Sequence, residues 1–151
     1  MSADDVQTIA AWHYPDPYSF YDLTADPDDL AEFLDLDDWE PDSHFGVWDP
    51  DGSLVGFFTF EYQEPTVIEV GLGLRPDRTG HGHGRLFVRT GLRFAREHFH
   101  PERFTLAVAA FNRRAVTLYR SLGFTEAGRF VQRTNGGEYD FIRMTLSASD
   151  V

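Results

Sequence analysis

The stretch VGLGLRPDRTGHGHGR, residues 70–85, carries the strongest structural signal in this chain. A strand-like apolar run ends before Pro76, and glycines then recur at every second position from Gly80 to Gly84. Residues 84–98 follow with the periodicity of an amphipathic helix. Glycine lets a backbone approach a ligand closely, and the first turn of a helix presents unpaired N–H groups to an anion. The stretch therefore predicts a phosphate cradle between a strand and a helix.

Two common phosphate sites do not fit this loop. A P-loop requires Gly-Lys-Ser/Thr at its end, but Gly84 is followed by Arg85, and all 13 basic residues of the chain are arginine. A dinucleotide fingerprint has a longer glycine spacing and an acidic residue after the next parallel strand. The next strand candidate, residues 104–110, ends without a carboxylate.

The loop resembles the acyl-CoA-binding motif of the GCN5-related N-acetyltransferases, the GNAT family. A second segment, FNRRAVTLYRSLGF at residues 111–124, resembles that family's other signature, with Asn112, Ala115 and Tyr119 in the matching places. On a helix these three residues share one face. Two motifs in the right order and at the right separation identify the chain as similar to this family.

The resemblance implies an α/β (α+β) fold in which helices flank a central, mixed and mostly antiparallel sheet. We expect a single domain over residues 1–151, since this length suffices for one core. The expected helices are residues 4–12, 26–34, 84–98 and 112–122. The expected strands are residues 43–48, 54–62, 66–74, 104–110, 125–134 and 139–146. The family usually begins with a strand, whereas here too few residues precede Val6 for one.

The resemblance also implies acetyl-CoA as the co-substrate. Backbone groups of Leu72 and Leu74 are expected to pair with its pantetheine arm, and the loop amides with its pyrophosphate. The family most often has Arg or Gln where Thr79 stands, so Arg78 is expected to supply the charge. The full expected set is Leu72, Leu74, Arg78, Thr79, Gly80, His81, Gly82, His83, Gly84, Arg85 and Asn112. Asn112 is equally suited to cap a helix.

Acetyl transfer to an amine requires a base for the ammonium and an acid for the leaving thiolate. Glu69 is the expected base, directly or through water, with Glu61 a lesser candidate. The alternative is a Glu69 that is simply exposed or paired with an arginine. Tyr119 is the expected acid by resemblance, since a phenol with a pKa of about 10 is protonated at neutral pH. The alternative is a core tyrosine.

Small residues in strand 66–74 have two explanations. Alternation places Ile68, Val70, Leu72 and Leu74 on one face of this strand and leaves Gly71 and Gly73 on the other. A glycine within a strand marks close approach by a ligand or by packed groups.

The composition of the chain limits which classes of binding partner are expected. The net charge of −12 argues against nucleic acid, which needs a basic face, and favours attraction of a cationic amine. Adaptation to a salt-rich host would give the same bias. Without cysteine there are no disulfides or thiolate ligands, and the pair His81 and His83 is a poor metal site, so no metal is expected. No apolar run reaches the ~18 residues of a membrane span. We therefore expect no membrane partner and a cytoplasmic location.

The leading hypothesis is an acetyl-CoA-dependent N-acetyltransferase that acts on a primary amine of a small molecule or a protein N-terminus. The alternative is a non-catalytic acyl-CoA-binding or sensory module, and a third is a nucleotide-binding domain of another class. Tyr14, Tyr18 and Tyr21 either cage an ammonium by cation–π contacts or cover the core. The oligomeric state stays open, and the C-terminal hairpin offers an edge for pairing across a homodimer.

Overall fold

A six-stranded sheet organises the chain, with the strand order β1-β2-β3-β4-β6-β5. The computed structural model describes residues 1–80 and 82–151. The strands are β1 (His44–Trp48), β2 (Leu54–Glu64), β3 (Val67–Leu74), β4 (Arg103–Ala109), β5 (Thr125–Thr134) and β6 (Gly137–Ser147). The α-helices are α1 (Ala3–Ala10), α2 (Pro27–Leu34), α3 (His83–Phe99) and α4 (Arg113–Ser121). Every neighbouring pair of strands is antiparallel except β3 and β4, which confirms the expected fold class.

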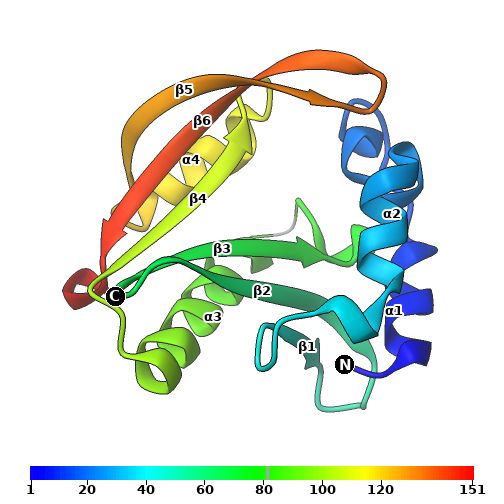
Figure 1. The fold of residues 1–151 in the computed structure, drawn as a ribbon, viewed down its shortest axis with the longest axis horizontal. Coiled ribbons are helices and arrows are strands. Elements are labelled where there is room, and N and C mark those ends of the chain that lie inside the picture. The colour runs from blue at the N-terminus through cyan, green and yellow to red at the C-terminus, as the bar shows by residue number, and fades with distance from the viewer. Residues whose placement is uncertain (81) are drawn as a thin grey trace.

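The sheet opens between β3 and β4. These two strands pair only over residues 67–69 of β3 and 103–105 of β4. The pairing of β2 with β3 continues to Leu74, and that of β4 with β6 continues to Ala109. The two halves of the sheet therefore diverge after Glu69, and the gap widens toward α1 and α2 in Figure 1. Within the described residues, one edge of β3 beyond Glu69 has no strand beside it.

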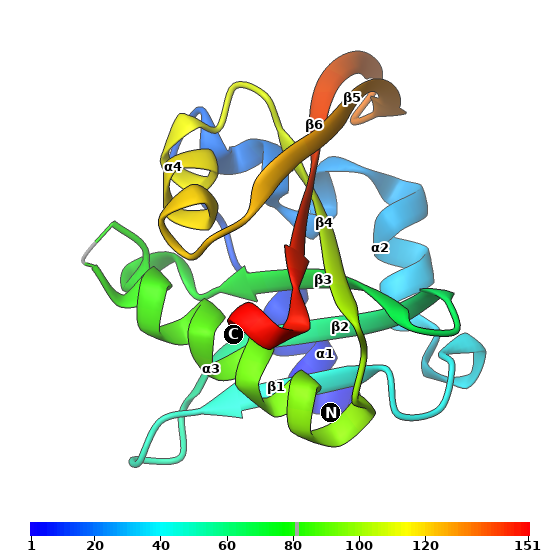
Figure 2. The same cartoon turned by 90° about the vertical axis from the view of Figure 1, so that its left-hand side faces the viewer.

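Helices α3 and α4 cover one face of the sheet (Figure 2). The alternation predicted for β3 is confirmed, because Ile68 and Val70 lie in the core beneath them, whereas Leu72 and Leu74 lie at its edge. A Cβ at Gly91 of α3 would overlap the ring of Phe58, so that glycine allows α3 to approach β2 closely.

The two N-terminal helices begin with side-chain caps. Asp26 caps α2, with Pro27 in the first turn, as the sequence predicts. Ser2 and Asp5 form a capping box at the start of α1, which the sequence analysis missed. Among the described residues, no strand precedes α1. None of the described helices has the length and apolar character needed to cross a bilayer.

Asp26 also holds the C-terminal hairpin. One carboxylate oxygen accepts hydrogen bonds from the backbone N–H groups of Asp28 and Asp29, and the other accepts one from the Asn135 N–H at 2.9 Å. Asn135 and Gly136 have φ values of 51° and 75°, which suits a tight hairpin turn. The predicted hairpin is confirmed, and its tip is fastened to the start of α2.

Candidate active site

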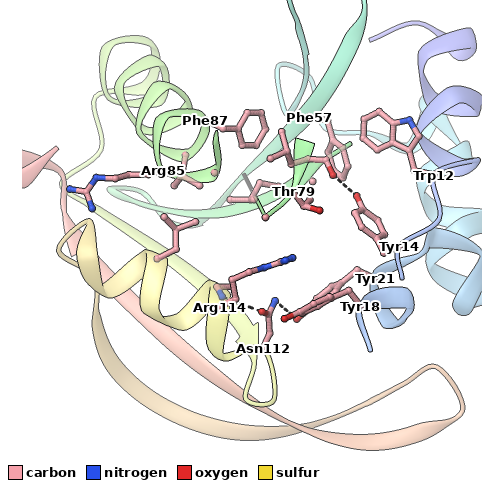
Figure 3. Close-up of a pocket in the computed structure, with 18 of the residues that line it drawn as sticks. Trp12, Tyr14, Tyr18, Tyr21, Phe57, Thr79, Arg85, Phe87, Asn112 and Arg114 are labelled. Carbon is pink, nitrogen blue, oxygen red and sulfur yellow. Dashed lines mark hydrogen bonds between the residues drawn. The ribbon is translucent and has the colours of Figure 1, made fainter. Parts of the chain in front are cut away.

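A cavity of about 500 Å³ lies where the two halves of the sheet diverge. Its walls come from the end of β3, the glycine loop, the first turns of α3, the inner side of α4 and residues 12–23 (Figure 3). Of the residues expected to contact acetyl-CoA or act as the acid, it brings together Leu72, Leu74, Thr79, Gly80, Gly82, Gly84, Arg85, Asn112 and Tyr119. Arg78 and His83 do not line it, and His81 lies outside the described residues. Two motifs that are separate in sequence thus meet around one cavity.

The glycine loop leads directly into α3. Gly82 precedes the first residue of the helix and has a φ of 78°, in the left-handed region. A Cβ built on Gly82 would meet no atom within 4 Å, so there is open space at this position. A Cβ on Gly84 would lie 3.2 Å from Leu118, because α3 and α4 pack closely there. The loop and helix start have the form that suits an anion.

Two expected phosphate contacts have other partners. The N–H and the hydroxyl of Thr79 both donate to the carbonyl of Pro76, at 3.3 and 2.7 Å. The guanidinium of Arg78 pairs with Asp49 at 2.9 Å. Arg85 lines the cavity, and its Nη1 donates to the Ser121 hydroxyl at 2.7 Å.

Arg114 is a cavity residue that the sequence analysis missed. It lies in the first turn of α4, and its Cζ sits 4.2 Å from the centroid of the Tyr18 ring. Its Nη1 lies 3.4 Å from the position of a Cβ built on Gly80, which places the guanidinium beside the loop. The signal was available in the sequence, because Arg114 follows the motif asparagine by two positions.

Tyr119 and Asn112 face the cavity from α4. Tyr119 is 8% exposed, and burial raises the pKa of its phenol, which keeps the hydroxyl protonated. The Asn112 side-chain oxygen accepts a hydrogen bond from the Ala115 N–H at 3.1 Å, so its predicted capping role is confirmed. Its amide nitrogen donates to the hydroxyl of Tyr21 at 3.1 Å.

Residues 12–23 close one end of the cavity. The hydroxyl of Tyr14 donates to the Leu74 carbonyl at 2.7 Å, while Tyr21 is held by Asn112 on the other half of the sheet. Asp22 accepts a hydrogen bond from the Tyr14 N–H at 2.8 Å, which folds the segment on itself. The face of Tyr18 is covered by Arg114, so the three tyrosines do not form an open cage in this structure.

Glu69 lies in a second cavity, of about 370 Å³, on the sheet face opposite α3. Its carboxylate accepts hydrogen bonds from Arg143 at 3.0 Å and from Gln63 at 3.1 Å. The structure therefore shows Glu69 paired with an arginine, which was the alternative to its role as a base. Glu61 lines the same cavity, and its pKa is raised by burial and then by the nearby charges of Glu69 and Glu32.

The glycines of β3 have a packing explanation. A Cβ at Gly71 would overlap the hydroxyl of Thr59, and one at Gly73 would overlap the ring of Phe57. Side chains of β2 thus fold over these glycines. Among the described residues, no group of three or more His, Asp or Glu side chains is arranged to hold a metal.

Comparison with known proteins gives three kinds of match. The model of the acetyltransferase (GNAT) family matches residues 6–124. The mycothiol acetyltransferase of Streptomyces coelicolor is 38% identical over 97 residues, which are 60% of this chain and 31% of that protein. The chain therefore spans about a third of the length of this relative.

Two solved structures from Vibrio cholerae share the fold. A spermidine N-acetyltransferase in complex with CoA and spermine has a TM-score of 0.79 at 22% identity, with 99% of this chain and 94% of that chain covered. Mutant forms of a spermidine/spermine N-acetyltransferase have a TM-score of 0.74 at 23% identity, with 99% and 91% covered.

Proposed function

Because the chain belongs to the acetyltransferase (GNAT) family, we propose that it transfers an acetyl group from acetyl-CoA directly onto a primary amine. The observation that carries this proposal is the opening of the sheet after Glu69. That opening leaves the edge of β3 free, beside a cavity that has the glycine loop at one end and Tyr119 in its wall. The acceptor is a small-molecule amine, and a protein N-terminus is the second acceptor to test.

The residues that would hold acetyl-CoA lie along one path. The amides of Gly80, Gly82 and Gly84 and the first turn of α3 face the pyrophosphate, with Arg114 as the added cation. The backbone of Leu72 and Leu74 pairs with the pantetheine arm. Because the hydroxyl of Tyr14 donates to the Leu74 carbonyl in this structure, that tyrosine moves or shares the carbonyl when the arm is bound.

The reaction then needs three proton transfers. The amine nitrogen forms a bond to the thioester carbonyl carbon, and the carbon–sulfur bond breaks. Tyr119 donates its phenolic proton to the leaving sulfur and recovers a proton from the nitrogen as the amide forms. Glu69 accepts the ammonium proton through water, since both its oxygens already accept hydrogen bonds. Glu61, with its raised pKa, is the second candidate for the base.

One observation favours a binding module without catalysis. The carboxylate of Glu69 is held by Arg143 and Gln63 and does not line the cavity that contains Tyr119. A sensory module would bind acetyl-CoA and turn over no amine.

The test combines binding with turnover. Calorimetric titration with acetyl-CoA is expected to show saturable one-site binding, and release of the CoA thiol is expected with at least one amine. The chain has no cysteine, so a thiol-reactive dye gives no protein background. The amines include spermidine, a neutral alkylamine and a peptide with a free N-terminus.

Tyr119→Phe separates the two functions. We expect turnover to fall by roughly 100-fold, a usual effect of losing a general acid, while the Kd for acetyl-CoA stays unchanged. Tyr62→Phe, on a side chain that is 58% exposed, is the control. Binding without turnover on any amine would support the sensory module, and no binding by folded protein would overturn both.

A further inference from the structure

Two glutamates face one another across β2 and β3 on the sheet face opposite α3. Glu61 and Glu69 are directly paired in the antiparallel register. Like charges at such positions destabilise a sheet, so the pair breaks a local rule of strand pairing. Violations of this kind are expected at functional sites, where another requirement outweighs stability.

The charges around this pair do not balance. Arg143 forms an ion pair with Glu69 at 3.0 Å. The carboxylate of Glu61 has no hydrogen bond or ion pair within residues 1–80 and 82–151. Glu32 of α2 is near enough for its charge to raise the pKa of Glu61 further. Two carboxylates thus share one guanidinium in this cavity, and the excess charge is negative.

The pair borders the second cavity, which has room for a ligand. Besides Glu61, Glu69 and Arg143, its walls include the rings of Phe130 and Phe141. Arg143 lies over Phe130, with its Cζ 5.3 Å from the ring centroid, so the arginine is supported from one side and paired on the other. The cavity therefore has an apolar wall and, beside it, the unpaired carboxylate of Glu61. This combination suits an alkyl chain that ends in a cationic group.

The second cavity adjoins the first along β3. Gly71 lines it, and the following residue, Leu72, lines the first cavity. Glu69 precedes Leu72 by three positions, which is roughly 10 Å along a strand. An acceptor whose amine reaches Leu72 would therefore place a group several carbons away beside Glu61.

We propose that this cavity binds a second cationic group of the acceptor, and that the substrates are amines with a second positive charge, such as diamines. Glu61 is the specificity-determining residue, and Phe130 and Phe141 contact the connecting chain. The inference rests on the proposed function and adds the substrate class to it. An acceptor with a carboxylate in place of the second cation is disfavoured. Its negative charge would lie beside Glu61, and Arg143 cannot compensate because it is already paired with Glu69.

Three acceptors of matched chain length test the proposal: 1,5-diaminopentane, pentylamine and 6-aminohexanoate. We expect kcat/KM to be highest for the diamine, by about tenfold over pentylamine, because only the diamine places a cation beside the Glu61 carboxylate. Glu61→Gln is expected to remove most of this preference, because kcat/KM for the diamine falls by more than kcat/KM for pentylamine. Glu64→Gln, on the same strand but outside the cavity, removes the same charge and should change neither.

Several results would overturn the inference. One is a diamine preference that persists in Glu61→Gln, and another is 6-aminohexanoate as the best acceptor. A third is a loss of rate in Glu61→Gln that is as large for pentylamine as for the diamine. The last result would make Glu61 a base instead of a binding residue. Urea unfolding of each variant confirms that it is folded.

A binding measurement keeps the inference separate from the proposed function. 1,5-Diaminopentane is titrated calorimetrically into protein saturated with CoA, where no transfer occurs. Binding by the wild type that is weakened about tenfold in Glu61→Gln supports the cation subsite even if no amine is acetylated. An absence of binding by the wild type overturns it, even if another amine is a substrate.

Discussion

The phenol of Tyr14 donates a 2.7 Å hydrogen bond to the carbonyl of Leu74, a residue 60 positions further along the chain. The bond fastens residues 12–23 to the open edge of β3. Leu74 is also one of the two residues whose backbone groups the family resemblance assigns to the pantetheine arm. The backbone of Leu74 would then bind Tyr14 in the free protein and the pantetheine arm in the acetyl-CoA complex.

Replacing Tyr14 with phenylalanine tests this competition. Loss of the bond should lower the free energy of unfolding of the free protein by about 1 kcal/mol. If the pantetheine arm displaces the tyrosine, the variant binds acetyl-CoA more tightly, and the destabilisation shrinks at saturating ligand. Thermal unfolding with and without acetyl-CoA measures both effects. Tyr18→Phe is the control, and equal destabilisation in both conditions would mean that the two partners do not compete.

Gly82→Val tests the glycine loop. The φ of 78° is unfavourable for any residue with a Cβ, and more so for a branched one. We expect the Kd for acetyl-CoA to rise at least tenfold, since a loss of ~1.4 kcal/mol in the loop's contacts with phosphate suffices for that. Gly52→Val is the matched control, because Gly52 has a φ of 83° in the turn between β1 and β2, away from the cavity. Equal loss of binding in both variants would point to general destabilisation.

Arg114→Gln tests the added phosphate cation. Removal of a charge-assisted contact should weaken acetyl-CoA binding by about tenfold at low salt and by less at high salt. Arg113→Gln removes the same charge one position earlier, on a residue that does not line the cavity, and should change the Kd little. Calorimetry at two salt concentrations gives both numbers. An equal rise of the Kd in the two variants would mean that Arg114 acts only through the general charge of the protein and makes no direct contact with phosphate.

His44 gives the folded protein a pH dependence. Its ring stacks on Trp39 with the centroids 3.7 Å apart, and burial lowers its pKa to about 4 from an ordinary 6.5. The unfolded chain therefore binds more protons than the folded one between these values, so the free energy of unfolding falls as the pH drops from about 6.5 to 4.

Urea unfolding, followed by tryptophan fluorescence, measures this slope. His44→Asn should flatten it within that pH window. An unchanged slope would assign the dependence to other groups.

Local sequence signals predicted most of the fold. Asp26 and Pro27 marked the start of α2, and Asn135-Gly136 marked the hairpin, because caps and tight turns depend on residues that are adjacent in the chain. The motif residues Asn112 and Tyr119 line one cavity with the glycine loop.

What the sequence could not provide were contacts between distant segments. The partner of Glu69 is Arg143, 74 positions away, and no local pattern connects them. The same holds for the bond between Tyr14 and Leu74. Thr79 shows the reverse case, since it was expected to contact acetyl-CoA, but its hydroxyl donates to a carbonyl three residues back. Competition by the chain's own backbone is hard to anticipate from residue type alone.

The double role of Asp26 has a consequence for synthesis on the ribosome. The N-terminal helix that it caps is fastened at its start to Asn135. In addition, β6 lies between β4 and β5 in the sheet, so β4 lacks this neighbour until residues 137–147 have emerged. The first and last parts of the described chain therefore reach their final arrangement together. We expect a nascent chain halted before β6 to resist proteolysis far less than the released protein.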